Sequence, residues 1–450
     1  MAECPVTAEY IRRCLEPGSA LRDAGRRAPF LPEFGEGLAP WLLPRPMFLP
    51  QSVVDSAFAD LTAVLDAAVS VPARLFGGDP FAMYEAVNMP ADSVALLRRT
   101  SGGPPPRYGR ADMLFDGQRL RLIELNIGSE LGGVQFGEMS RGLLAVPQFR
   151  DFAAEHRLSH VDTAAEIIEV LRRVAEPVTG GRRDPVVALV TWIGNIAALP
   201  ALYTSFQAIV AAHGIELHLV DVTEVTERDG KLYVGATPVD VALRYFALGE
   251  VRGHPDGAAL IEPILRAHER GGTVLFSDLN GNAYAYKDGL AFLSDPRYRE
   301  HFTAEQAAAI DRLLPWSRRV VDETTDVDGV AVPLLDHCRS HRESLILKPH
   351  DGYDAAGTVA GWEASAEQWD EVLARSPNGE YIVQRRVDPQ TDPVVDPQTG
   401  EVLDCTTVYG VFYTERGYGG MFNRVQGPGR TSVITRASGI GITSTFTYPG

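Results

Sequence analysis

A predicted β-hairpin at residues 108–129 constrains the fold more than any other part of the chain. The stretch reads YGRADMLFDGQRLRLIELNIGS, in which two runs rich in apolar residues flank an Asp-Gly dipeptide. Asp-Gly between two such runs is a strong signal for a hairpin turn. We therefore expect two adjacent antiparallel strands, whose polar residues must face one side of a sheet or the other.

Four polar residues recur at the spacing of a single strand face. Arg110 and Asp112 are separated by one residue on the first strand, and so are Glu124 and Asn126 on the second. Side chains at positions i and i+2 point to the same face of a strand. If the turn comprises residues 116–118, Arg110 lies opposite Glu124 and all four groups share one face, whereas a turn shorter by one residue would break this parity.

The chemistry of these four side chains suits a site for a metal ion and a phosphate. Two carboxylates and an amide oxygen are hard ligands of the kind that Mg²⁺ takes together with waters and substrate phosphates. An arginine beside them can hold a transferring phosphoryl group. The alternative is a solvated hairpin face on which the charged residues form cross-strand ion pairs.

Lysine is scarce in this chain, which draws attention to each one. Of the 42 Lys and Arg residues, only Lys231, Lys287 and Lys348 are lysines. Lys348 ends the predicted strand SLILKP, and the loop after it contains Gly352 and Gly357, whose flexible backbone and free N–H groups suit a phosphate. Lys287 lies near the start of a predicted helix. Because lysine reaches phosphate as a mobile point charge, we interpret these two lysines as phosphate contacts and Lys231 as a turn residue.

The bulk properties exclude several classes of protein. A chain of 450 residues is too long for one simple core. The net charge of −17 and the lack of a basic run argue against a nucleic-acid partner. We find no apolar run of about 18 residues, which a membrane helix requires, and the first residues lack the layout of a secretion signal. The four cysteines show no Cys-x-x-Cys spacing, so we expect free thiols and a cytoplasmic location.

The predicted elements differ along the chain. Residues up to about 100 have mostly helical spacing of apolar residues. In residues 185–275, PVVALVTW, LYTSFQAIVAAHG and IELHLVDV read as strand, helix and strand, which indicates a βαβ unit and a parallel sheet. Later segments mix both types, with YIVQRRV as a strand and SAEQWDEVLARS as a helix that has Ser365 as its N-cap.

Taken together, these motifs resemble a known family, the circularly permuted ATP-grasp ligases of the glutathionylspermidine synthase type. In that family Arg-x-Asp precedes Glu-x-Asn by about the distance that separates Asp112 from Glu124 here. The family's two lysines, one before a helix and one in a strand before a Gly-rich loop, are matched by Lys287 and Lys348. A strand of the form YIxQ is matched by YIVQ, which ends at Gln384, and GATPVDVALRYF resembles part of the family's inserted domain.

The resemblance covers roughly residues 105–450 and implies a mixed α/β (α+β) architecture. This is a circularly permuted ATP-grasp fold with an inserted βαβ domain, similar to a pre-ATP-grasp domain, and a helical N-terminal region. The implied parts are a mostly helical region at 1–104, the metal-binding half of the ATP-grasp domain at 105–184, the inserted domain at 185–275, and the lysine-bearing half with the C-terminal strands at 276–450.

The resemblance also implies an activity. Such a protein is an ATP-dependent carboxylate–amine ligase, which forms an amide bond through an acyl phosphate on a small amino acid, a peptide or a polyamine. ATP and Mg²⁺, with two ions expected, are the implied cofactors, and the partners are small molecules, with no nucleic acid and no membrane. Two other interpretations stay open, namely a degenerate nucleotide-binding scaffold and a phosphotransferase that stops at phosphorylation.

Carried over residue by residue, the resemblance assigns a role to each polar motif. Arg110 is the catalytic residue that steadies the transferring phosphoryl group, and Glu124 is expected to bridge two metal ions. The implied metal ligands are Asp112, Glu124 and Asn126. The implied nucleotide contacts are Lys287, Lys348, Gly352, Gly357, Tyr381, Ile382, Val383 and Gln384. The last four of these form a strand whose backbone is expected to meet adenine.

The chain departs from the family in two loops. ELNIGSELGG stands where the family often has Ala-Asp-x-Pro after its Glu-x-Asn, and HDGYDAAG after Lys348 lacks a tight Gly-Gly pair. Both loops are expected near substrate and phosphate. We therefore expect the departures to affect the identity of the acid and the amine more than the binding of ATP.

Overall fold

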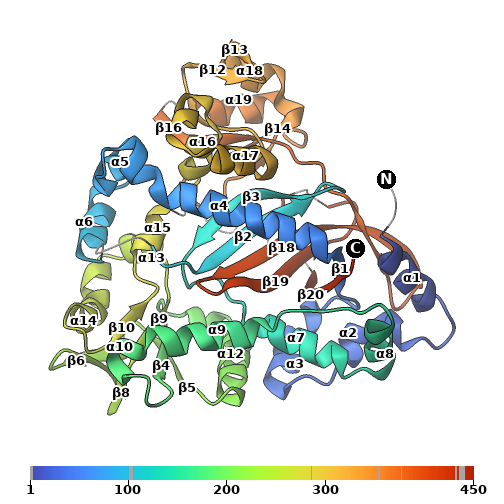
Figure 1. Cartoon of the computed structure of the whole chain (residues 1–450). Coiled ribbons are helices and arrows are strands. Elements are labelled where there is room, and N and C mark those ends of the chain that lie inside the picture. The colour runs from blue at the N-terminus through green and yellow to red at the C-terminus, as the bar shows by residue number, and fades with distance from the viewer. Residues whose placement is uncertain are drawn as a thin grey trace.

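The structure, a computed structural model, contains several β-sheets with helices packed around them (Figure 1). It describes residues 4–100, 105–284, 286–352, 355–376, 378–430, 433–434 and 441–450.

A large sheet forms the centre of the molecule. Its strand order is β1-β20-β19-β18-β2-β3, with β17 paired to β18, and only the contact of β1 with β20 in it is parallel. The sheet joins strands from distant parts of the sequence, which are β1 (Met47–Pro50), β2 (Gly109–Phe115), β3 (Leu120–Ile127), β17 (Asp392–Val395), β18 (Val402–Thr414), β19 (Gly417–Gln426) and β20 (Gly441–Tyr448).

Helices cover both faces of the large sheet (Figure 1). The long helix α4 (Gln51–Leu75) crosses one face and buries its apolar side there. On the other face lie α7 (Val134–Leu144) and α9 (Thr163–Val174), and Phe136 of α7 stacks on Phe422 of β19 with ring centroids 4.0 Å apart. The second face is the one that carries the polar residues of the hairpin.

The hairpin has a β-bulge that sequence patterning did not predict. The turn is longer than expected, because Phe115 pairs with Leu120, and this register would place Asp112 opposite Ile123. Ile123 is instead the extra residue of the bulge, so Asp112 lies opposite Glu124 and Arg110 opposite Asn126. The predicted pairing of Arg110 with Glu124 is therefore wrong. The predicted shared face exists because the bulge restores the parity that the longer turn breaks.

A parallel sheet lies beside the large one, at the lower left of Figure 1. Its order is β10-β9-β4-β5, and its strands all run parallel, as the βαβ pattern predicted. The elements are β4 (Val186–Thr191), α12 (Pro200–Ala212), β5 (Glu216–Asp221), β9 (Val241–Tyr245), α14 (Gly257–Glu269) and β10 (Val274–Phe276), and a small antiparallel sheet of β6 (Val225–Arg228), β7 (Lys231–Val234) and β8 (Thr237–Val239) adjoins them.

A third sheet forms the upper lobe in Figure 1 and is called here the upper sheet. Its antiparallel strands are ordered β11-β16-β14-β15, with β11 (Ser317–Val321), β14 (Leu345–Pro349), β15 (Val359–Ala360) and β16 (Asn378–Arg385). One face packs against α18 (Leu334–Ser340) and α19 (Ala366–Ala374), where Trp369 is buried. Ser365 caps α19, as predicted. The other face is turned toward β3 of the large sheet.

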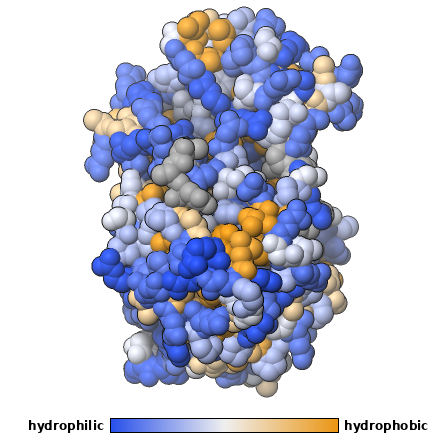
Figure 2. Space-filling view, turned by 90° about the vertical axis from the view of Figure 1, so that its right-hand side faces the viewer, coloured by the Kyte–Doolittle hydropathy of each residue, from blue (hydrophilic) through white to orange (hydrophobic). Residues whose placement is uncertain are grey.

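The remaining elements are mostly short connections. They are α1 (Pro5–Cys14), α2 (Ala24–Arg27), α3 (Pro32–Leu38), α5 (Pro80–Ala86), α6 (Ala91–Thr100), α8 (Pro147–Glu155), α10 (Glu176–Thr179), α11 (Asn195–Ala198), α13 (Leu248–Gly253), α15 (Asn280–Tyr284), α16 (Asp288–Ser294), α17 (Ala304–Leu313), β12 (Thr324–Val327), β13 (Val330–Pro333) and four 3₁₀ turns within the described residues. Figure 2 shows a mostly hydrophilic face with scattered hydrophobic groups. In the described part of the chain, no helix combines the length and the apolar character that crossing a membrane requires.

Gly109 provides a test of how tightly the hairpin packs against β18. The Tyr413 hydroxyl donates a hydrogen bond to the Asn126 carbonyl at 3.0 Å, and a Cβ added at Gly109 would overlap both groups. Gly109→Ala should therefore lower the free energy of unfolding by about 1–3 kcal/mol, as other overpacked cores do. Urea denaturation measures this change. In the control Gly249→Ala, the added Cβ meets no atom within 4 Å, so an equal loss in both variants would contradict the packing argument.

Candidate active site

The four polar residues of the hairpin lie together on one face of β2 and β3, next to the upper sheet. The bulge at Ile123 places Glu124 and Asn126 beside Asp112 and Arg110. Asp112 is almost fully buried, with 1% of its surface exposed, while Glu124 and Asn126 are partly exposed. This face is thus the polar floor on which the other charged groups of the site converge.

Asp112 holds two arginines rather than standing free. Arg110 donates to it through Nε at 2.7 Å and Nη2 at 3.2 Å, and Nη2 of Arg424 donates to Oδ2 at 2.6 Å. Burial opposes the charge on Asp112, but the two guanidinium groups outweigh it and lower its pKa below the ordinary value. The cross-strand pair of Arg110 with Glu124 considered from the sequence does not form. The role of Asp112 as a Mg²⁺ ligand stays a prediction, and it would require one arginine to release an oxygen.

Arg424 belongs to a set of residues that the sequence analysis missed. Arg424 and Gln426 face the same side of the large sheet as Asp112, and so does Ser444 of β20. Among the described residues, the Nε of Arg424, both polar atoms of Gln426 and the Oγ of Ser444 are buried without a hydrogen-bond partner. Such atoms are unusual in a folded core and point to a polar group that would complete them. The alternation of Arg424 and Gln426 was visible in the sequence, but nothing local linked their strand to the hairpin.

Lys348 crosses from the upper sheet to the bulge. Its Nζ donates to the carbonyl oxygen of Ile123 at 2.8 Å and to Oε1 of Gln384 at 2.8 Å. The side chain is buried, and burial lowers the pKa of Lys348 from 10.5 to about 8, with a smaller effect in the same direction from Lys287 and opposition from Glu124. The lysine therefore keeps a poorly solvated ammonium at the junction of the two sheets.

Lys287 reaches the same place from another segment. It directly precedes α16, as predicted, and its Nζ lies 3.2 Å from Oε1 of Glu124. The same Nζ donates to the carbonyl of Gly352, in the loop after β14, at 2.7 Å. The structure thus brings Lys287, Lys348 and Glu124 together from three separate segments, and Gly352 joins them through its backbone.

The strand that was predicted to meet adenine lies in the middle of the upper sheet. Tyr381 to Gln384 lie in β16, the central strand between β11 and β14. Ile382, Val383 and Gln384 pair on both sides, so their backbone groups are engaged within the sheet, and the contact to adenine stays a prediction. The Gln384 side chain instead links Lys348 to Ser317, whose Oγ lies 3.1 Å from Nε2.

The Gly-rich loop after Lys348 spans residues 350–358, of which 353 and 354 lie outside the described residues. Gly357 has φ of +74°, a conformation that favours glycine, and an added Cβ would lie 2.9 Å from Cγ of Pro349 and 3.3 Å from the Tyr381 hydroxyl. The predicted roles of Gly352, Gly357 and Tyr381 in nucleotide binding stay predictions. Their packing shows that the loop lies close to the strands that carry Lys348 and Gln384.

The loop after Asn126 connects the site to the parallel sheet. Arg110 donates through Nη1 to the Leu131 carbonyl at 3.1 Å. Glu130 lies 2.8 Å from Nη2 of Arg244, which is fully buried at the end of β9. Ser129 exchanges hydrogen bonds with Ser277 just after β10, with its N–H 3.0 Å from the Ser277 Oγ. These contacts fix the loop against the carboxyl ends of parallel strands, where α/β proteins commonly bind small molecules.

The donor set near Glu124 suits Mg²⁺ only in combination with a phosphate. Within the described residues there is no group of three or more His, Cys, Asp or Glu side chains placed to hold a metal ion. Glu124 and Asn126 nevertheless offer one carboxylate and one amide oxygen on the same face. Mg²⁺ typically takes one or two carboxylates and completes its shell with water and substrate phosphates.

Comparison with solved structures places the fold. A glutathione synthetase-like effector from Globodera pallida, in its apo form, has a similar structure, with a TM-score of 0.53, 14% sequence identity, and coverage of 91% of this chain and 90% of that one. A candidate gamma-glutamylcysteine synthetase from Methylobacillus flagellatus aligns less well, with a TM-score of 0.42, 14% identity, and coverage of 84% and 88%. At this identity the first likeness establishes a mixed α/β fold similar to that of the glutathione synthetase-like effector, and nothing finer. Searches with protein-family models and against curated proteins gave no match.

The pKa of Lys348 generates a test of its environment. Below about pH 8 the amino group is charged in the folded and unfolded states, and the fold carries the cost of burying the charge. Between about 8 and 10.5 the folded state loses the proton first, so stability should rise with pH. The wild type should therefore gain up to about 3 kcal/mol relative to Lys348→Met across this window. Denaturation at several pH values measures the difference, with Lys231→Met as the control, and parallel curves for wild type and Lys348→Met would contradict the assignment.

Proposed function

We propose that the protein is an ATP-dependent carboxylate–amine ligase. The observation that carries the proposal is the convergence of Lys287 and Lys348 on adjacent residues of β3, the Ile123 carbonyl and the Glu124 carboxylate, at 3.2 Å or less. The lysines come from separate segments in a chain that otherwise uses arginine. Two ammonium groups beside a carboxylate and an amide suit the polyphosphate of a nucleotide with its metal ion.

Arg110 is suited to the phosphoryl group in transfer. Its guanidinium is held by Asp112 through two hydrogen bonds and is fixed further by the Leu131 carbonyl. A donor fixed in advance lowers a barrier most when charge develops in the transition state, because it needs no reorganisation at that moment. Arg110 would therefore neutralise charge on the γ-phosphoryl oxygens, while Asp112 keeps the guanidinium in place.

Glu124 and Asn126 fit the metal ion that such a reaction uses. These two residues would hold Mg²⁺, which supplies positive charge that neutralises the phosphates. Glu124 would exchange its contact with Lys287 for the metal, which frees the ammonium for a phosphate. Asp112 would join the ligands only by releasing an arginine. In this way the same side chains would pair with one another in the protein alone and exchange those pairs for metal and phosphate contacts when a nucleotide binds.

The proposed reaction has two steps. An oxygen of the substrate carboxylate attacks the γ-phosphorus, the bond to the bridging oxygen breaks, and ADP leaves. The amine nitrogen then attacks the acyl carbon, the phosphate departs, and the amine loses a proton. Arg424, Gln426 and Ser444 supply polar atoms that have no partner among the described residues, on the same sheet face, and would bind the polar part of the acid. A small amino acid, a short peptide or a polyamine fits this chemistry, and the likeness in fold to a glutathione synthetase-like effector is in keeping with it.

A screen of acid and amine pairs for ADP release tests the proposal. A ligase releases ADP only when a suitable acid is present and forms a condensed product that mass spectrometry detects. ADP release with an acid but no condensation with any amine would indicate a phosphotransferase. Binding of ATP without any ADP release across the screen would indicate a nucleotide-binding scaffold.

The acyl-phosphate step has its own signature. If the carboxylate attacks the γ-phosphorus, one of its oxygens stays with the phosphate after the amine displaces it. With ¹⁸O in the carboxylate of the active acid, we expect the label in the released phosphate. Mass spectrometry of the phosphate measures it. Unlabelled phosphate alongside a labelled amide carbonyl and water would rule out this path.

Glu124→Gln tests the metal-binding face. The variant keeps the size of the side chain and removes the charge, so we expect a folded protein whose kcat falls by about 10²-fold or more, as for other fixed electrostatic groups. Raising Mg²⁺ should restore little of it. Glu323→Gln is the matched control, because Glu323 is 32% exposed and paired with Arg297, much as Glu124 is 27% exposed and paired with Lys287. Near-normal turnover in Glu124→Gln would contradict the assignment.

A further inference from the structure

A buried carboxylate lies directly behind the two lysines of the site. Asp288 follows Lys287 at the start of α16 and is fully buried. Its Oδ1 accepts a hydrogen bond from Nε of Arg319 in β11 at 2.6 Å, and its Oδ2 lies 3.1 Å from Nδ1 of His350. His350 is two residues after Lys348. The carboxylate of Asp288 thus contacts the two segments that carry the lysines, and it also contacts β11 of the upper sheet.

Further hydrogen bonds tie the same segments together. The backbone N–H of Lys287 donates to the His350 carbonyl at 3.0 Å, and the N–H of His350 donates to the Glu380 carbonyl at 3.0 Å. The Tyr286 ring packs edge-on against the His350 imidazole, with centroids 5.2 Å apart. His350 is therefore held on several sides, and Asp288 is the charged group among these contacts.

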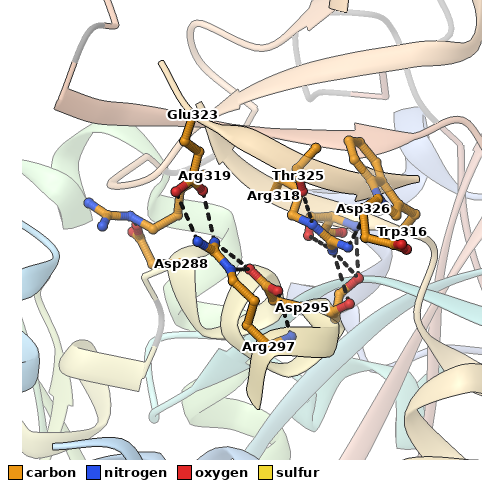
Figure 3. A network of polar contacts seen from close by, with 11 residues as sticks. Asp288, Asp295, Arg297, Trp316, Arg318, Arg319, Glu323, Thr325 and Asp326 are labelled. Atoms are coloured by element: carbon orange, nitrogen blue, oxygen red, sulfur yellow. Dashed lines mark hydrogen bonds and ion pairs between the residues drawn. The ribbon is translucent and has the colours of Figure 1, made fainter. Parts of the chain in front are cut away.

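The position of Asp288 separates it from the groups that stabilise the upper lobe. The apolar core of that lobe lies on the opposite face of the upper sheet, around Trp369. A second ionic network nearby joins Arg297 to Asp295 and Glu323 (Figure 3). Figure 3 shows Asp288 beside Arg319, at the other end of α16 from Asp295. The Arg297 network contacts neither lysine, so it offers a built-in comparison for a purely structural ion pair.

We propose that Asp288 is a positioning residue that fixes the distance between Lys287 and Lys348, and thereby sets the affinity of the site for the nucleotide. The inference rests on the proposed function, because it takes the two lysines to be phosphate contacts. Lys287 has its place set by the start of α16, and Lys348 by β14 and the loop that begins at His350. Asp288 is bonded to both segments, so loss of its charge lets them move apart while the apolar core keeps the lobe folded.

Calorimetric titration of the full chain with MgATP tests this role without knowledge of the acid or the amine. Asp288→Asn should weaken MgATP binding by about tenfold or more, since a site loses much of its strength when its support is loosened by a fraction of an ångström. Asp295→Asn is the matched control, because Asp295 is also buried, also paired with an arginine, and adjoins the same helix. We expect Asp295→Asn to lower the melting temperature and to bind MgATP within about twofold of the wild type.

Each outcome bears on one idea. Failure of the wild type to bind MgATP would overturn the proposed function. Binding by the wild type with equal affinity in Asp288→Asn, or equal weakening in Asp288→Asn and Asp295→Asn, would overturn the positioning role alone. If Asp288→Asn fails to fold, His350→Ala provides the same reading, because it removes one arm of the clamp and leaves Asp288 paired with Arg319. MgATP binding of wild-type strength in His350→Ala would then overturn the role.

Discussion

The contact between Lys348 and the bulged residue Ile123 is the interaction on which the rest of the site depends. A bulge leaves one residue outside the regular ladder and turns the strand locally. Here it moves Glu124 and Asn126 to the face of Asp112, and it presents a carbonyl to the ammonium of a lysine from another sheet at 2.8 Å. The same residue therefore sets the parity of the hairpin and the point where the upper sheet meets the large one. Burying the ammonium has a cost, which is visible in the pKa of Lys348 at about 8.

The charges at the junction have the opposite balance from the whole chain. The molecule carries a net charge of −17, yet here four cations gather around two carboxylates, and three of the four are paired with them. These groups are Arg110, Arg424, Lys287 and Lys348, with Asp112 and Glu124. Such an excess in a poorly solvated place attracts an anion more strongly than it would in water. A small polyanion can enter the cationic junction, whereas a large one would also lie on the acidic surface and be repelled there. The charge distribution therefore favours a small polyanion as the ligand.

Much of this arrangement could be predicted from local patterns, and the remainder depends on pairing between distant strands. The hairpin, the parallel sheet, α19 and the helix start at Lys287 follow from periodicity and turn chemistry, which neighbouring residues decide. The bulge at Ile123 could not be predicted, because a three-residue turn and a longer turn with one bulge give the same final face. Arg424 was missed because its place beside Asp112 follows from the order β19-β18-β2, which joins residues far apart in the sequence. The central place of the strand that carries Tyr381 to Gln384 could not be predicted either, because its neighbours β11 and β14 come from other parts of the sequence.

The loop after Asn126 joins the polar face of the hairpin to the parallel sheet. Its contacts run to Arg110 on one side and to Arg244 and Ser277 of the parallel sheet on the other. Neither lysine touches it among the described contacts of Lys287 and Lys348. A change in this loop therefore alters the end of the site that faces the parallel sheet, while the junction of Lys348 with the bulge stays as it is. The departure of ELNIGSELGG from the resembled family lies in this loop, so under the proposed function we expect it to bear on the choice of acid and amine. Under the proposed function, such a change leaves the contacts of the two lysines in place, but it reaches the phosphoryl group through the Leu131 carbonyl that holds Arg110.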